Sequence, residues 1–233
     1  MKRTVVLISL SLLAGCTAAS QPVKRGDANK VTVIELYQSQ GCSSCPPALA
    51  VLDQSAGERT DVIALNFAVT YWDQLGWKDQ YAQPAFTARQ WDYARAGGRG
   101  NVQTPQLIVN GVRAVLGSRK GEVDSAIAAA AGKSRGPDIA ISGSRLTVSA
   151  GSAAKGQVWI VNYDPRRVPV AIGAGENGGR TLVHRNIVRH LTSLGAWTGS
   201  ASAYTLPAAS PGLLRAALVQ VDKGGPILAA KRL

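Results

Sequence analysis

The chain has 233 residues, of which 45% are hydrophobic and 17% are charged. This composition excludes a disordered chain and allows one large or two modest domains. The formal net charge is +12, but the densest basic cluster is only the short segment DPRRV at residues 164–168. We therefore expect a basic protein that works near an anionic surface and does not bind nucleic acid.

The first residues have the pattern of a secretory signal. Lys2 and Arg3 precede an apolar run from Val5 to Leu13, and small residues follow. Such a run is too short to cross a membrane as a mature helix. The sequence therefore predicts export to a compartment outside the inner membrane, where disulfides persist.

The signal ends in Leu13-Ala14-Gly15-Cys16, which resembles a bacterial lipobox. In that motif the signal is cut before the cysteine, whose sulfur and amine are then acylated. We expect a lipoprotein signal peptide over residues 1–15, a tether over residues 16–30, and a lipid anchor on Cys16 that holds the protein at the periplasmic side of a membrane. Ordinary cleavage near residues 18–19, which would leave a free thiol, is the alternative.

Hydrophobic periodicity predicts alternating strands and helices over residues 31–132. In chain order, the predicted elements are a buried strand at Val31–Tyr37, a helix at Ala48–Ala56 preceded by two prolines, a strand at Asp61–Val69, a helix at Pro84–Ala96, a hairpin of Gln106–Val109 and Val112–Leu116 around an Asn-Gly turn, and a helix at residues 121–132. This order predicts a mixed sheet covered by helices, which is the order of the thioredoxin fold.

The composition changes after a Gly-rich stretch at residues 132–138, which has the character of a linker. Short β-like runs then recur, separated by Gly and Pro. They lie at Ile139–Ser142, Leu146–Ser149, Gln157–Tyr163, Val168–Ile172, Arg180–Leu194, Leu214–Asp222 and Ile227–Ala230. We expect an α/β thioredoxin-like domain over residues 31–132, followed by a small all-β, sandwich-like domain over residues 138–233.

Cys42 and Cys45 form a C-x-x-C motif between the first predicted strand and the first predicted helix. Unpaired N–H groups at a helix N-terminus stabilise a thiolate, which is the reactive form of cysteine. This placement predicts that Cys42 is an exposed nucleophile. It also predicts that Cys45, on the same side of the first turn, is a more buried thiol that resolves a mixed disulfide formed at Cys42.

Thr104 and Pro105 stand just before the third predicted strand. In thioredoxin-like proteins a cis-proline at this place lies beside the C-x-x-C motif, and the backbone before it receives the extended chain of the substrate. We therefore expect a cis Thr104-Pro105 bond and a substrate-binding role for both residues. A trans proline at the start of a strand is the alternative.

The segment between the second predicted strand and the end of the next helix is rich in aromatic residues. It holds Tyr71, Trp72, Trp77, Tyr81, Phe86, Trp91 and Tyr93. The segment leaves the same sheet edge as the cysteines, which is the edge where ligands bind in open α/β sheets. Trp72 and Trp77 are therefore candidate substrate contacts, while packing of the rings within the segment itself is an equal alternative.

Metal chemistry receives little support, and we predict no metal and no cofactor. Zinc would require His184 and His190 beside the cysteines, but six residues along one strand separate these histidines by about 20 Å. Copper would be left with the two sulfurs alone, because no His lies in the first domain and Met1 is the only Met.

Glu35 is unusual in its apolar strand, and we expect an exposed residue at a strand end, with proton transfer to the cysteines as the alternative.

Five segments together resemble a thioredoxin-like secreted-protein family catalogued as domain of unknown function 1223. They are VIELYQSQGCSSCPPA, YWDQLGWKD, PAFTARQWDYA, NVQTPQLIVNG and GENGGRTLVHRNIVR, and the closing ALVQVDKGGPILAAKRL fits as well. The resemblance implies export, a thioredoxin-like domain and a β-rich C-terminal domain, but no established reaction. Family members carry His and Asp where this chain has Ala68 and Thr70, so a ligand role there is not expected. Gly41 stands where thioredoxin has Trp.

These observations lead to an expected envelope thiol–disulfide oxidoreductase whose partners are protein thiols or a redox protein. A non-catalytic binding module with a structural Cys42–Cys45 disulfide is the competing interpretation, and a copper-handling protein is a weaker one. The sequence leaves the role of Gly175–Arg180 open between a functional segment and a simple turn.

Overall fold

The computed structural model describes residues 31–133, 136–151 and 155–233. The predicted signal peptide, the predicted acylation site at Cys16 and the tether over residues 16–30 lie outside these residues. Within the described ranges, no helix has both the length and the apolar character needed to cross a membrane.

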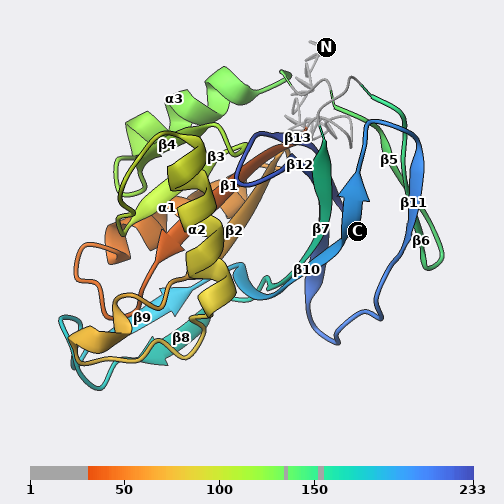
Figure 1. Ribbon diagram of the computed structural model, residues 1–233. Coiled ribbons are helices and arrows are strands. Elements are labelled where there is room, and N and C mark those ends of the chain that lie inside the picture. Colours follow the sequence, from red (N-terminus) through yellow and green to blue (C-terminus); the bar gives the residue numbers. More distant parts are fainter. Residues whose placement is uncertain (1–30, 134–135, 152–154) are drawn as a thin grey trace, which may run out of the picture.

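Helices and strands alternate in the first half, and strands dominate the second (Figure 1). The helices are α1 (Pro46–Glu58), the 3-10 turn η1 (Asp73–Leu75), α2 (Pro84–Ala96) and α3 (Lys120–Ala130). The first strands are β1 (Thr32–Gln38), β2 (Val62–Ala68), β3 (Gln106–Val109) and β4 (Arg113–Leu116). The later strands are β5 (Ile139–Ser142), β6 (Arg145–Val148), β7 (Gly156–Asp164), β8 (Val168–Ala171), β9 (Thr181–His184), β10 (Ile187–Trp197), β11 (Ser202–Thr205), β12 (Leu214–Val221) and β13 (Ile227–Arg232).

Eight of these strands form one sheet in the order β13-β12-β7-β10-β2-β1-β3-β4. β1 and β2 are parallel, and β3 runs antiparallel to β1. The two central strands are buried along their whole length, which agrees with their continuous apolar sequences. β5, β6 and β11 form a separate small sheet, and β8 pairs only with β9.

Two hydrophobic layers cover the main sheet. On one face, α1 and α3 pack against apolar residues of β1 and β3, among them Leu36 and Leu107. On the other face, α2 contributes Phe86 and Tyr93 to a cluster that also contains Val161 of β7. The small β5-β6-β11 sheet packs its apolar side chains over the far end of the main sheet, around Trp197. One core therefore contains side chains from both halves of the chain.

The expected sandwich-like arrangement after residue 138 is present in part, because β7, β10, β12 and β13 pack face to face with β5, β6 and β11 around a shared core. This half is not separate from the first, however, since the same strands continue the main sheet. The junction is the edge of β2, where Ile187 of β10 pairs with Asn66. An unpaired strand edge is satisfied by such pairing.

Asn186 directs the chain onto that edge. It has a left-handed backbone with φ of 52°, which ends the hairpin strand β9 before β10 begins. Its carbonyl accepts a hydrogen bond from the Asn66 N–H at 2.9 Å. Its side-chain amide donates to the Ala64 carbonyl at 2.8 Å. The single strand predicted over Arg180–Leu194 is therefore two strands that belong to different sheets.

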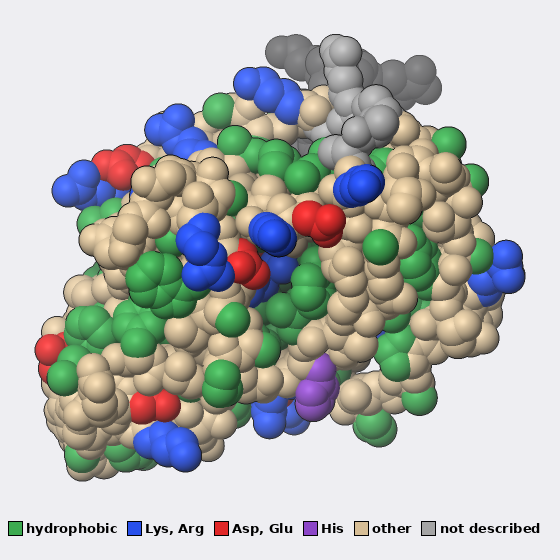
Figure 2. Space-filling view, in the orientation of Figure 1, with side chains coloured by type: hydrophobic (Ala, Val, Ile, Leu, Met, Phe, Trp, Pro, Cys, Tyr) green, Lys and Arg blue, Asp and Glu red, His purple; other side chains and the backbone are tan. Residues whose placement is uncertain are grey.

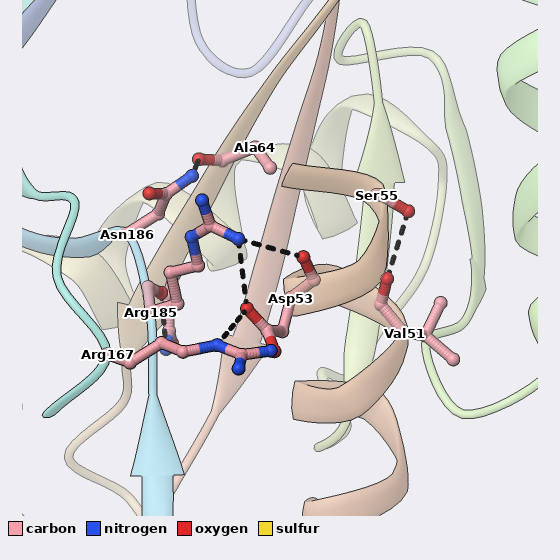
Figure 3. A network of polar contacts seen from close by, with 8 residues as sticks. Val51, Asp53, Ser55, Ala64, Arg167, Arg185 and Asn186 are labelled. Carbon is pink, nitrogen blue, oxygen red and sulfur yellow. Dashed lines mark hydrogen bonds and ion pairs between the residues drawn. The ribbon is translucent and has the colours of Figure 1, made fainter. Parts of the chain in front are cut away.

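The β8–β9 hairpin lies against α1 and the segment between β2 and α2 (Figure 1). Asp53 of α1 holds the base of the hairpin, because Arg167 and Arg185 converge on its carboxylate from the two ends (Figure 3). These guanidinium groups lower the pKa of Asp53 through hydrogen bonds and charge, Arg167 contributing most. The loop that joins the two strands thereby comes to lie over the end of β1, where the cysteines are.

Candidate functional site

Cys42 and Cys45 form a disulfide in the turn that connects β1 to α1, with 5.4 Å between their Cα atoms. The Cys45 N–H donates to the Cys42 carbonyl at 3.1 Å, which closes this turn. Cys45 is the N-cap of α1, and prolines occupy the first two helical positions, where no N–H is required. The second cysteine, and not the first, therefore marks the start of the helix.

Neither cysteine is exposed: the exposed fraction of each is 0%. The prediction of an exposed Cys42 and a more buried Cys45 is wrong in this respect. Thr104 lies against both sulfurs, and the loop between β8 and β9 binds backbone groups of residues 40–43. Only Ser43 and Ser44, between the two cysteines, are exposed.

Thr104 contacts both sulfurs. Its hydroxyl oxygen lies 3.2 Å from the Cys45 sulfur, and its carbonyl oxygen lies 3.8 Å from the Cys42 sulfur. The hydroxyl also donates to the Tyr37 carbonyl at 3.3 Å, which fixes its position at the end of β1. The Thr104-Pro105 bond is cis, as predicted. The structure therefore brings the predicted cysteines and the predicted Thr-Pro pair together.

The segment Gly175–Arg180, which we call the cap segment, lies on the cysteine turn. The Asn177 amide donates to the carbonyls of Gln40 at 2.9 Å and Cys42 at 2.8 Å. The Glu176 carboxylate accepts a hydrogen bond from the Ser43 N–H at 2.8 Å. Asn177 is itself fully buried. The sequence left this segment between a functional role and a simple turn, and in the structure it binds the backbone of the cysteine turn.

Trp72 and Trp77 lie on another side of the same turn. A Cβ atom added to Gly41 would meet Trp72 Cδ1 at 3.3 Å and Trp77 Cβ at 3.6 Å, so the two side chains lie close to the backbone directly before Cys42. Trp77 Nε1 donates to the side chain of Gln40 at 3.0 Å.

The remaining aromatic residues of the segment have different places. Phe86 and Tyr93 belong to the core under α2, and Tyr81 packs with the β8–β9 hairpin. Tyr71 donates its hydroxyl to Gln90 at 3.2 Å. Phe86, Tyr93 and Tyr81 therefore help to build the fold, Trp72 and Trp77 border the cysteine turn, and their contact with a substrate stays a prediction.

Asp79 is a buried acid that sequence reasoning missed. Its carboxylate accepts hydrogen bonds from the backbone N–H groups of Gln40 at 2.8 Å and Tyr81 at 2.9 Å. Burial raises the pKa of Asp79 to about 6, although these hydrogen bonds act in the opposite direction. The side chain links the aromatic segment to the residues just before Cys42.

Glu35 is buried, and its expected exposure is wrong. It forms an ion pair with Arg89 of α2, and the exposed fractions of the two side chains are 1% and 6%. The Tyr37 hydroxyl also donates to it at 3.1 Å. An Arg on the buried face of the predicted α2 helix was the signal for this pairing, since a buried charge requires a partner.

The structure places the two histidines on different strands, β9 and β10, and not on one strand. Burial lowers the pKa of His184 to about 4. No hydrogen-bond partner is found for its ring nitrogens among the described residues. His190 is exposed. Among the residues that the structure describes, no three His, Cys, Asp or Glu side chains come together as metal ligands would.

An apolar cavity of about 480 Å³ lies elsewhere, between the β3–β4 hairpin, the end of α3 and β13. Its described lining includes Arg113, Lys133 and Trp197 but neither cysteine. On the face in Figure 2, Lys and Arg side chains are spread over separate places. The cavity is therefore separate from Cys42 and Cys45, and the disulfide with its surroundings remains the candidate site.

Comparisons with known proteins identify a family and similar solved structures. The family described as "Protein of unknown function (DUF1223)" matches residues 33–220. A comparison with curated proteins finds no match. A crystal structure of an Agrobacterium tumefaciens protein, determined by the Northeast Structural Genomics Consortium, is similar with a TM-score of 0.71 and 30% identity, covering 88% of this chain and 94% of that chain.

HBP35 of Porphyromonas gingivalis is similar in fold alone. Its TM-score is 0.53 at 12% identity, over 89% of this chain and 76% of that chain. The family match covers the cysteine turn, the Thr104-Pro105 bond and the cap segment together. The chain therefore belongs to the DUF1223 family, a family of proteins of unknown function.

Proposed function

We propose that this protein is a thiol–disulfide oxidoreductase of the cell envelope that works through Cys42 and Cys45. The observation that carries the proposal is the position of Thr104, whose hydroxyl and carbonyl oxygens lie beside the two sulfurs. A purely structural disulfide has no need of a polar residue that contacts both sulfurs. No metal and no cofactor enter the proposed reaction.

The arrangement of the first half supports this proposal. β1 and β2 are parallel, β3 runs antiparallel to β1, β4 runs antiparallel to β3, and helices lie on both faces. This is the order of a thioredoxin-like domain, with the C-x-x-C motif leaving the central strand. We propose this fold for residues 31–132, with the second half as an extension that covers the site.

The proposed reaction is an exchange of one disulfide for another. A thiolate of a reduced partner attacks Cys42, the bond between the two cysteines breaks, and Cys45 leaves as a thiolate. The second thiol of the partner then attacks the mixed disulfide and releases Cys42. The partner is oxidised to a disulfide, and the Cys42–Cys45 pair receives two electrons. In the reverse direction, reduced Cys42 attacks a partner disulfide and Cys45 resolves the intermediate.

Thr104 has a defined task in either direction. Its single hydroxyl proton points to the Tyr37 carbonyl in this structure, and it is proposed to turn to the nearby Cys45 thiolate that forms when the disulfide opens. Its backbone, together with Pro105, is proposed to align the extended chain of the partner. Trp72 and Trp77, which border the turn, are proposed to limit which partners fit.

A second candidate function is favoured by the burial of both cysteines. In a non-catalytic binding module the disulfide would only fix the turn, and 0% exposure of both residues suits that role. A redox titration separates the candidates, because structural disulfides have reduction potentials below about −300 mV and catalytic ones are more oxidising.

Trapping of a partner tests the proposed function directly. Cys45→Ala leaves a mixed disulfide at Cys42 unresolved, so reducible high-mass adducts with envelope proteins should accumulate. Cys42→Ala is the matched control, because it removes the proposed nucleophile and should give none. If neither variant forms adducts and the wild-type pair fails to exchange with a model dithiol, the oxidoreductase proposal fails and the binding module replaces it.

The location of the protein is a proposal of its own. We propose export and acylation of Cys16, with the folded part held at the periplasmic side of a membrane by the tether over residues 16–30. Cys16→Ser should move the protein from the membrane fraction to the soluble envelope fraction. Unchanged fractionation of this variant would contradict the lipid anchor.

A further inference from the structure

We propose that Asn177 is a positioning residue that keeps the cap segment closed over the disulfide, so that a thiol reaches Cys42 only when this segment moves. The inference rests on the proposed function and deepens it. It assigns the segment Gly175–Arg180 to the control of access, and it defines the kind of partner that can open the site.

The contacts of Asn177 are made to the backbone of the cysteine turn. Its amide donates to two carbonyls in that turn, those of Gln40 and Cys42. Its side-chain carbonyl oxygen accepts a hydrogen bond from the Arg180 guanidinium at 2.6 Å, which fixes the orientation of the amide. The side chain of Asn177 is buried, and such a buried amide with all three partners satisfied is costly to remove.

The cap segment makes a further contact at its exposed side. The Glu176 carboxylate accepts a hydrogen bond from the N–H of Ser43, one of the two residues between the cysteines. Two acceptors and one donor of residues 40–43 are thus engaged by residues 176–177. A substrate polypeptide lying along the turn would use these same backbone groups, so the cap segment occupies the place of a partner.

The base of the hairpin is held by charged groups. Asp53 of α1 binds both Arg167 and Arg185 there (Figure 3). The loop has glycines at positions 175, 178 and 179, of which the first and last have positive φ, and Gly175 lies close to Trp77. Movement of the loop about the base therefore needs the loss of the hydrogen bonds to residues 40–43 and of this close approach.

The backbone groups of the cysteine turn favour a partner that offers matching hydrogen-bond donors and acceptors. The groups left free when the cap segment moves are the carbonyl of Gln40 and the N–H of Ser43, whereas the Cys42 carbonyl keeps its hydrogen bond from the Cys45 N–H. A polypeptide in extended conformation supplies N–H and C=O groups in alternation and satisfies them, whereas a small thiol satisfies none. We therefore assign protein thiols, presented on an extended segment, as the partners that open the site.

The test measures access to the disulfide, using the wild-type protein and single variants. Dithiothreitol reduces the pair in two steps: one thiolate forms a mixed disulfide, and the second displaces the protein sulfur. Dithiothreitol becomes a cyclic disulfide, and each cysteine gains one electron and one proton. The reduction rate is followed by alkylation of the free cysteines and mass spectrometry.

Asn177→Ala and Asn177→Asp should both raise this rate about tenfold, because losing two hydrogen bonds of ordinary strength increases the open population by about that factor. Asn177→Asp keeps the size of the side chain and places a carboxylate against two carbonyls. Thr181→Ala, at an exposed position of β9, is the matched control and should leave the rate unchanged. Rates within twofold of the wild type for both Asn177 variants would overturn the proposal.

A second measurement separates opening of the cap segment from unfolding. Local opening exposes little surface, so the wild-type rate should stay nearly constant in urea well below the unfolding transition. A rate that rises in parallel with global unfolding would also overturn the proposal. Failure of the oxidoreductase proposal gives a different result from failure of the cap-segment proposal. In that case Cys45→Ala traps no partner, although the disulfides of the Asn177 variants are still reduced faster than that of the wild type.

Discussion

Arg89 of α2 donates to Glu35 of β1 in the interior of the protein, with 2.8 Å between Nη2 and Oε1. The same guanidinium donates to the Tyr93 hydroxyl at 2.9 Å and lies 5.6 Å from the ring centre of Trp159 in β7. Gln220 of β12 also donates to the Tyr93 hydroxyl, at 2.9 Å. This buried network connects the central strand, the helix above it and strands of the second half.

Removal of one member of the ion pair should strongly destabilise the fold. Arg89→Met leaves the Glu35 carboxylate buried without its cation, and the expected loss in free energy of unfolding is about 3–5 kcal/mol. Urea denaturation followed by circular dichroism measures it. The double variant Glu35→Gln, Arg89→Met should recover part of the loss, because no unpaired charge remains. A double variant that is less stable than Arg89→Met would contradict this account.

Two buried groups should give opposite dependences of stability on pH. Burial lowers the pKa of His184 from 6.5 to about 4 in the folded protein. As the pH falls through this interval, the unfolded chain gains a proton that the folded protein does not bind, so the contribution of His184 to the free energy of unfolding falls. Folded Asp79 keeps its proton up to about pH 6, and the unfolded residue loses it near 3.8, so its contribution is present at low pH and is lost as the pH rises. Each effect amounts to at most ~3 kcal/mol.

Single variants should reveal these opposing slopes. Relative to the wild type, His184→Gln should become more stable as the pH falls from 6 to 4. Asp79→Asn should become less stable over the same interval. Unfolding midpoints in urea at several pH values check both signs, and identical pH profiles for the two variants would exclude the assigned pKa directions.

The Thr104 hydroxyl should stabilise the reduced state of the pair. Thr104→Val keeps the shape of the side chain but removes the donor 3.2 Å from the Cys45 sulfur. A hydrogen bond to a charged group contributes about 1.5–3 kcal/mol, which corresponds to a reduction potential about 30–60 mV more negative in the variant. A redox titration against a dithiol buffer measures the shift. Thr104→Ser, which retains the hydroxyl, should stay close to the wild type, and a shift of equal size there would refute the role of the hydroxyl.

A chain truncated after residue 132 should not form a stable fold. The truncation removes β10 from the edge of β2 and takes Val161, Ala216 and Leu218 from the core cluster under α2. Exposed strand edges and apolar faces lead to aggregation. Expression of the truncated chain and gel filtration provide the test. A soluble, cooperatively unfolding fragment would support the division into two domains that the linker-like residues 132–138 predict.

Local patterns in the sequence were sufficient for much of the secondary structure. The alternation of apolar strands with helical runs located β1, α1, β2, α2, β3, β4 and α3, since each element carries its own periodicity. The C-x-x-C motif and the Thr-Pro pair were recognised for the same reason, because each is a short motif at a strand end. β11 was missed, since its four residues carry no continuous apolar face.

The pairing of the two halves was decided only by tertiary structure. Strand order depends on which edge a strand finds, and that information is not contained in the periodicity of the strand itself. Glu35 was expected at the surface because its partner Arg89 lies 54 residues away in the sequence. The contacts of Cys42 could not be predicted for the same reason, since Asn177 donates to its carbonyl from 135 residues away.

By itself, then, the sequence determined the types of most elements, the two cysteines and their likeness to a redox motif, because these follow from residues close together in the chain. Tertiary structure alone decided that the second half extends the sheet of the first and that its loop binds the backbone of the cysteine turn. Those contacts form between residues far apart in the sequence, and their energies depend on edges and buried groups that exist only after the chain has folded.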